Sequence, residues 1–98
     1  MEPMPRQERL DDDAIAEALA GLPGWSRAGD EIVKTFERRT FPDAIAFVVR
    51  IGFLAEAMDH HPDLDVRWRR VRVALTTHDS AGLTRNDIDL AGAIEELV

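Results

Sequence analysis

A long apolar-periodic segment between two prolines constrains the fold of this chain more than any other feature. Between Phe41 and Met58 the apolar residues recur every three or four positions, the spacing that places side chains on one face of an α-helix. Pro42 stands where the first turn of a helix tolerates proline, and Pro62 follows just past the last turn. The sequence therefore predicts a helix over residues 41–58, in the middle of the chain.

A further helix is expected near each end of the chain. Three consecutive aspartates at residues 11–13 precede an apolar stripe at helical spacing, where the positive end of a helix favours acidic side chains. The glycines and proline of residues 21–24 would end this first helix. Towards the C-terminus, Thr84-x-x-Asp87 resembles a capping box in front of the apolar positions of a third helix.

Four strands are expected between these helices. Residues 25–27 and 31–39 surround a glycine turn, which is typical of a hairpin, and residues 64–67 and 71–75 flank a second turn near Trp68. The order α-β-β-α-β-β-α, with no repeat and no linker, predicts an α+β fold: a four-stranded antiparallel sheet with its helices packed on one face. We expect a flexible N-terminal segment over residues 1–9 and a single domain over residues 10–98.

Charge and composition argue against several classes of function. The chain has 19 acidic and 12 basic residues, and this net charge of −7 opposes phosphate contacts, so no direct nucleic-acid partner is expected. It has no cysteine, which excludes disulfides and thiolate chemistry. Residues 1–9 lack the apolar core of a signal peptide, and no stretch has the length of a membrane span. A cytoplasmic protein without membrane contact is the expectation.

The three histidines fall into one pattern with acidic neighbours. The pattern runs Glu56-x3-His60-His61-Pro62 and continues to His78 and Asp87. Imidazole is the side chain that both donates and accepts protons near neutral pH, so this grouping predicts proton-transfer chemistry. Glu56 is four residues before His60 and could orient that ring from the end of the helix. His61 precedes proline, which favours an extended backbone and turns its side chain away from that of His60.

At these residues the sequence resembles the pterin-4a-carbinolamine dehydratase family, also known as the dimerisation cofactor of a homeodomain transcription factor. The matching stretches extend over about four fifths of the chain and comprise Gly24-Trp25, Ala55-Glu56, Asp59-His60-His61-Pro62, Thr77-His78, Ala81-Gly82-Leu83 and Asp87-Ile88. The resemblance implies a hydro-lyase, 4a-hydroxytetrahydrobiopterin dehydratase. Such an enzyme eliminates water to give quinonoid dihydropterin, and so recycles tetrahydrobiopterin after aromatic amino-acid hydroxylation. The pterin is its substrate, and the resemblance implies no cofactor and no metal.

The resemblance also implies roles for individual residues. His60 and His78 would be the acid–base pair, His61 would hold the pterin and assist, and Glu56 and Asp87 would support them. The implied pterin pocket consists of His60, His61, Pro62, Thr77, His78, Asp79 and Ser80, and an indole of Trp25 or Trp68 could form one wall. Because a four-stranded sheet has edges to cover and the family forms dimers and tetramers, we expect a homodimer or a tetramer.

Several alternatives stay open at the level of sequence. A zinc site could use the histidines with Glu56, Asp59 or Asp63, although adjacent histidines rarely chelate one ion. Asp87 could serve only as the capping-box residue, the two tryptophans could be core or rim residues, and the basic run of residues 67–72 could be a solvated hairpin. For the whole protein, the alternatives are a non-catalytic protein-binding or dimerisation module, or a role in molybdopterin-related metabolism. Two positions depart from the common family pattern, Leu64 and Trp68, and they bear on pocket shape.

Overall fold

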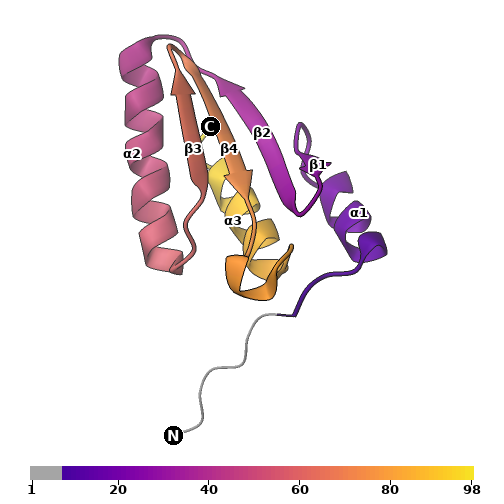
Figure 1. The fold of residues 1–98 in the computed structure, drawn as a ribbon. Helices are drawn as coiled ribbons and strands as arrows, with labels where there is room; N and C mark the ends of the chain where they lie inside the picture. The colour runs from indigo at the N-terminus through magenta and orange to yellow at the C-terminus, as the bar shows by residue number, and fades with distance from the viewer. Residues whose placement is uncertain (1–7) are drawn as a thin grey trace, which may run out of the picture.

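The predicted order of elements is confirmed in the computed structural model, which describes residues 8–98. Most of the expected N-terminal segment 1–9 lies outside these residues. The elements, in chain order, are α1 (Asp12–Ala20), β1 (Ser26–Ala28), β2 (Glu31–Glu37), α2 (Phe41–Met58), β3 (Asp63–Arg67), β4 (Arg70–Leu75), the short 3-10 helix η1 (His78–Ser80) and α3 (Arg85–Glu95). The strands form one antiparallel sheet in the order β1-β2-β4-β3 (Figure 1). Strands that follow one another in the sequence are therefore adjacent in the sheet, except for β2 and β3, which are separated by β4.

The long helix α2 begins and ends through specific capping contacts. At its start, the Thr40 hydroxyl accepts a hydrogen bond from the backbone N–H of Asp43 at 3.1 Å. The Asp43 carboxylate in turn accepts the backbone N–H of Arg39, and this bond, with the nearby Arg38 guanidinium, lowers the pKa of Asp43. The observed bounds of α2, Phe41–Met58, agree with those that the two prolines predicted.

The end of α2 is a tight turn that directs the following residues away from the helix. Asp59 adopts the left-handed conformation with φ 50°, and its N–H donates to the Glu56 carbonyl at 3.1 Å. The N–H of His60 donates to the Ala55 carbonyl at 3.0 Å, which completes a Schellman motif. His60 is consequently held by backbone bonds just beyond the helix, in a direction that no longer follows the helical repeat.

The core lies between one face of the sheet and the helices. In β4 the side chains of Val71, Val73 and Leu75 are fully buried, whereas those of Arg70 and Arg72 are exposed, as alternation along a strand requires. Ile32 and Phe36 of β2 belong to the same core. The helices contribute many of the other buried side chains, chiefly Ala44, Phe47, Ile51, Leu90, Ala91 and Ile94. The helices thus cover one face of the sheet, as predicted. Within residues 8–98, no helix combines the length and apolarity that crossing a membrane requires.

Candidate active site

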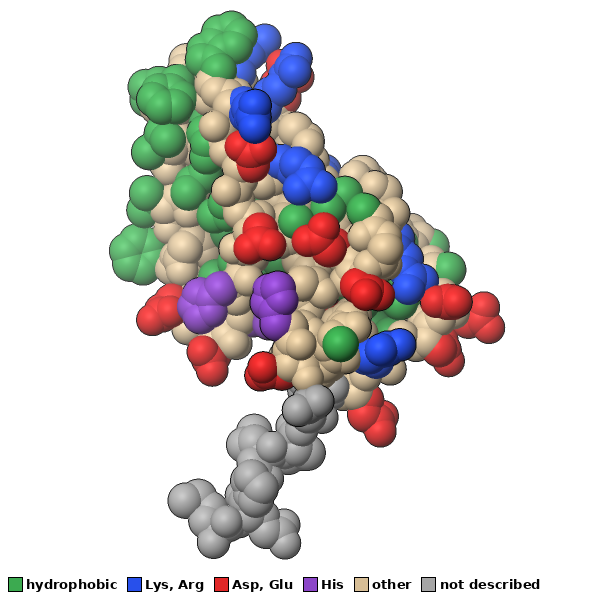
Figure 2. Space-filling model, in the orientation of Figure 1, with side chains coloured by type: hydrophobic (Ala, Val, Ile, Leu, Met, Phe, Trp, Pro, Cys, Tyr) green, Lys and Arg blue, Asp and Glu red, His purple; other side chains and the backbone are tan. Residues whose placement is uncertain are grey.

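All three histidines line one pocket at the edge of the sheet. A hollow of about 220 Å³ is formed by two chain segments, Asp59 to His61 and Thr76 to Asp79. Asp63 pairs with Ala74 in the antiparallel register of β3 and β4, so the segment entering β3 and the segment leaving β4 must meet at this edge. Figure 2 shows histidine side chains gathered on this part of the surface, below the outer face of α2. The grouping predicted from the sequence is therefore present in space.

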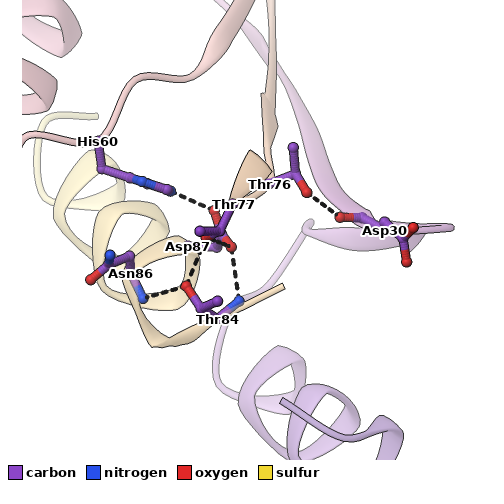
Figure 3. Close-up of polar contacts among 7 residues, drawn as sticks. All are labelled: Asp30, His60, Thr76, Thr77, Thr84, Asn86 and Asp87. Atoms are coloured by element: carbon purple, nitrogen blue, oxygen red, sulfur yellow. Dashed lines mark hydrogen bonds and ion pairs between the residues drawn. The ribbon is translucent and has the colours of Figure 1, made fainter. Parts of the chain in front are cut away.

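The imidazole of His60 is fixed by a buried carboxylate. Its Nε2 lies 2.6 Å from Oδ1 of Asp87, whose side chain is fully buried, and the His60 side chain is only 10% exposed. The second oxygen, Oδ2, accepts the Thr77 hydroxyl at 2.8 Å and the backbone N–H of Thr84 at 2.9 Å (Figure 3). Asp87 is also the acidic residue of the capping box at the start of α3. Asp87 thus caps α3 and also contacts a histidine of the pocket.

The carboxylate of Glu56 contacts His61, not His60, so that part of the sequence prediction is wrong. Its Oε1 lies 2.9 Å from Nε2 of His61, and these two side chains are 80% and 60% exposed. The expected contact assumed that the helical spacing continued to His60. The Schellman turn at Asp59 ends that spacing and turns His60 towards α3, which leaves Glu56 beside the next residue.

His78 presents an imidazole from the other wall of the pocket. It is exposed at the first residue of η1, and its side chain makes no hydrogen bond or ion pair with the rest of residues 8–98. Thr77 and Asp79, predicted as pterin-binding residues, line the same wall. Pro62 and Ser80 are adjacent in the chain to lining residues but are not among them.

Two lining residues were absent from the predicted pterin pocket, Asp59 and Thr76, although Asp59 was a candidate ligand in the zinc alternative. Asp59 could have been suspected, because aspartate is one of the few residues that tolerates the left-handed conformation after a helix. Thr76 carried no such signal. Its hydroxyl donates to the Asp30 carbonyl at 2.6 Å, a contact between segments that are far apart in the sequence.

Neither tryptophan forms a wall of this pocket within one chain. Trp25 is a core residue, 6% exposed, and its indole N–H donates to Glu95 Oε1 at 2.8 Å. Trp68 is 71% exposed in the turn between β3 and β4, and that turn is at the opposite end of these strands from the histidines. The proposed indole wall is therefore not formed by either residue here, because one ring is packed inside and the other is separated by the length of a strand.

Two of the three imidazoles in the pocket are each paired with a carboxylate. Within the described chain, no group of three or more histidine, aspartate or glutamate side chains has an arrangement that could hold a metal ion. The expectation of a metal-free reaction stays a prediction. What the geometry offers is one imidazole oriented by a buried anion, a second beside an exposed carboxylate, and a third that is unpaired within residues 8–98. Such a set is suited to moving protons on and off a small molecule.

Comparisons with known proteins agree with this site. The family model for pterin 4 alpha carbinolamine dehydratase matches residues 8–97. Relatives from Roseiflexus sp. (strain RS-1) and Thermosynechococcus vestitus are 58% and 50% identical over 90 residues each. Each alignment covers 92% of this chain, and the two alignments cover 97% and 95% of the respective relatives. Both relatives carry the name "Putative pterin-4-alpha-carbinolamine dehydratase".

A solved structure shares both the fold and part of the sequence. The crystal structure of a transcriptional coactivator/pterin dehydratase from Brucella melitensis superposes with a TM-score of 0.88 at 33% identity, over 92% of this chain and 98% of that one. Since the family model spans nearly the whole described chain and the relatives are aligned almost end to end, the agreement extends well beyond the histidine motif. The chain belongs to the pterin 4 alpha carbinolamine dehydratase family, a family of hydro-lyases.

Proposed function

We propose that this protein is a 4a-hydroxytetrahydrobiopterin dehydratase that acts by histidine acid–base catalysis in tetrahydrobiopterin recycling. The observation that carries the proposal is the pocket in which three imidazoles meet, one of them held at 2.6 Å by a fully buried carboxylate. The relatives named for the same reaction support the choice of a pterin carbinolamine as substrate.

The reaction needs proton transfer at two positions of the pterin and no electron transfer. A proton is delivered to the 4a-hydroxyl, the C4a–O bond breaks, and water leaves. The proton on N5 is removed, and its bonding electrons form the C4a=N5 double bond of the quinonoid product. We assign these transfers to His60 and His78, which stand on the two walls of the pocket, and pterin binding to His61. Each well-placed acid or base contributes roughly 10²- to 10⁴-fold in rate.

The test is the rate of carbinolamine dehydration, followed by the absorbance of the quinonoid product in stopped flow. His60→Ala and His78→Ala are each expected to lower kcat roughly 10²- to 10⁴-fold. Arg72→Ala, on the exposed face of the sheet, is the matched control and should keep the wild-type rate. Wild-type turnover no faster than the buffer reaction would exclude this function. A substrate panel that includes other pterins distinguishes biopterin recycling from molybdopterin-related metabolism.

A second candidate function, protein binding, is favoured by the outer face of α2. Four large apolar side chains are exposed there, at 40% to 77%, and they form a stripe with a spacing of four: Phe41, Ile45, Val49 and Phe53. Figure 2 shows this apolar surface along one side of the molecule. The Brucella protein's description as a transcriptional coactivator supports a protein-binding role in addition to catalysis.

We also propose that the protein forms a homodimer, or a tetramer built from dimers. The edge strand β3 has five residues, whereas the other edge strand, β1, has three. An unpaired edge of this kind is commonly covered by the same strand of a second copy across a two-fold axis. The α2 stripe offers a second surface for joining dimers. Cytoplasmic location and the absence of a nucleic-acid partner stay predictions from the sequence.

A further inference from the structure

The hydroxyl groups behind His60 form a chain whose proton directions can be deduced. Thr77 Oγ1 lies 2.8 Å from Asp87 Oδ2 and 2.7 Å from Thr84 Oγ1. A hydroxyl has one proton to donate, and an ionised carboxylate can only accept. If Asp87 is ionised, the Thr77 proton goes to Asp87, and the Thr84 proton must then go to Thr77.

The donors around Asp87 identify its carboxylate as an acceptor. Its Oδ2 accepts the backbone N–H of Thr84 at 2.9 Å in addition to the Thr77 hydroxyl. On the other oxygen, the shared proton lies between Oδ1 and Nε2 of His60. With Oδ1 accepting as Oδ2 does, the donor of this 2.6 Å contact is Nε2 of His60.

We propose, on the basis of the dehydratase function above, that Thr77 is a positioning residue. With Thr84 behind it, its hydroxyl holds Asp87 as the anion that keeps His60 protonated on Nε2, so that Nδ1 is the nitrogen that exchanges protons with the substrate. Thr77 was expected to bind the pterin. That stays a prediction for its other atoms, because its hydroxyl is committed to the carboxylate. The ring nitrogen opposite the Asp87 contact makes no hydrogen bond within residues 8–98.

The assignment has a chemical consequence for His60. With Nε2 always protonated and bonded to Asp87, the ring changes its protonation only at Nδ1. It accepts a proton there when neutral and donates from the same atom when charged. The contact from Nε2 to the buried carboxylate disfavours the tautomer in which Nδ1 would carry the proton of the neutral ring. Thr84 is fully buried and cannot touch a substrate, so its influence on the reaction must pass through Thr77 and Asp87.

The chain offers matched variants for a test. Thr77→Val keeps the shape of the side chain and removes the hydroxyl, and Thr77→Ser keeps the hydroxyl. Thr76→Val is the control, because Thr76 lines the same pocket but donates to the Asp30 carbonyl and does not contact Asp87. Two readouts are needed: two-bond ¹H–¹⁵N spectra of the histidine rings, which identify the protonated nitrogen, and kcat with KM. The three rings are assigned by substituting each histidine in turn.

The wild-type spectrum is expected to show neutral His60 with its proton on Nε2. Thr77→Val should shift His60 towards a mixture of tautomers and lower kcat roughly ten- to hundredfold with little change in KM, as expected for the loss of one hydrogen bond to a charged group. Thr77→Ser should restore both readouts, and Thr76→Val should leave the His60 spectrum unchanged.

Two results would overturn the proposal. One is a wild-type spectrum with the neutral-ring proton on Nδ1, which needs no variant and therefore does not depend on whether Thr77→Val folds. The other is a folded Thr77→Val protein whose spectrum and kcat equal those of the wild type. An inactive wild-type protein with the expected spectrum would instead exclude the dehydratase function and with it the catalytic use of Nδ1. The spectrum and the rate thus separate the two failures.

Discussion

Two carboxylates contact histidines in this pocket, and their surroundings give them unequal importance. Asp87 is fully buried with three donors on its two oxygens, whereas the Glu56 side chain is 80% exposed beside an exposed ring. Water can replace the contact that Glu56 makes, but nothing can replace a buried anion at a fixed distance from the ring. The site therefore depends on Asp87 far more than on Glu56.

Matched acid-to-amide substitutions test this difference. Asp87→Asn removes the charge that orients His60 and is expected to lower kcat roughly ten- to hundredfold, the usual effect of losing a hydrogen bond to a charged group. Glu56→Gln is expected to change kcat by less than about threefold, as for an exposed ion pair. The measurement is kcat and KM for dehydration, with circular dichroism to establish that both variants are folded. An equal loss in the two variants would contradict the unequal roles.

At the scale of residues, the sequence located the site better than it located the contacts. The three histidines and Asp87 were predicted as one group, and the structure brings them together. The partner of Glu56 was wrong because the i,i+4 spacing holds only inside a helix, and the helix ends at Asp59 in a left-handed turn. The contact between Thr76 and Asp30 depends on the packing of distant segments, which no local pattern encodes.

Helices were predicted well where a proline or capping signal agreed with the apolar periodicity. Pro42 and the apolar repeat identified α2, and the capping box identified the start of α3. The second strand was expected over residues 31–39 but ends at Glu37, because the chain turns there to enter the N-cap of α2. No helix was expected over the short η1, since three residues are too few to show a repeat.

The turn between β3 and β4 carries a residue that does not suit its backbone. Trp68 has φ 54°, a left-handed conformation that costs a side-chain-bearing residue about 1 kcal/mol relative to glycine, and its ring is 71% exposed. We expect Trp68→Gly to be more stable than Trp68→Ala by about 1 kcal/mol in urea unfolding, because both lose the ring and only glycine relieves the backbone. Equal midpoints for the two variants would contradict this strain. Dehydratase activity should be unchanged in both, since the turn is at the far end of the strands from the histidines.

Because all helices pack on one face of the sheet, the other face, with Arg70 and Arg72, is exposed, and the molecule has two further surfaces that a second copy could cover. One is the β3 edge of the sheet, and the other is the apolar stripe of α2. Assembly could be expected from the sequence only in general, because a second copy enters neither a periodicity nor a capping motif.

Light scattering measures the assembly directly. We expect a mass of at least twice the 11.0 kDa of one chain, and a stable monomer would refute the dimer. Phe53→Glu places a charge at the most exposed position of the α2 stripe and should lower the mass if this helix joins dimers. Ala16→Glu adds the same charge to an exposed position of α1 and is the control. An unchanged mass with Phe53→Glu would assign self-assembly to the β3 edge and leave the stripe for another protein.

The carboxylate of Asp87 closes the capping box of α3 and holds the ring of His60, so a single group belongs to two systems. Fraying of the first turn of α3 would release the ring at the same moment, because the carboxylate that contacts the ring also accepts the backbone N–H of Thr84. Heat should therefore abolish turnover and helix structure at one temperature, with no inactive folded state between them. A substitution of Asp87 during evolution would therefore lose both the cap of α3 and the contact to His60. A change that makes the start of α3 more stable would also hold the His60 ring more rigidly.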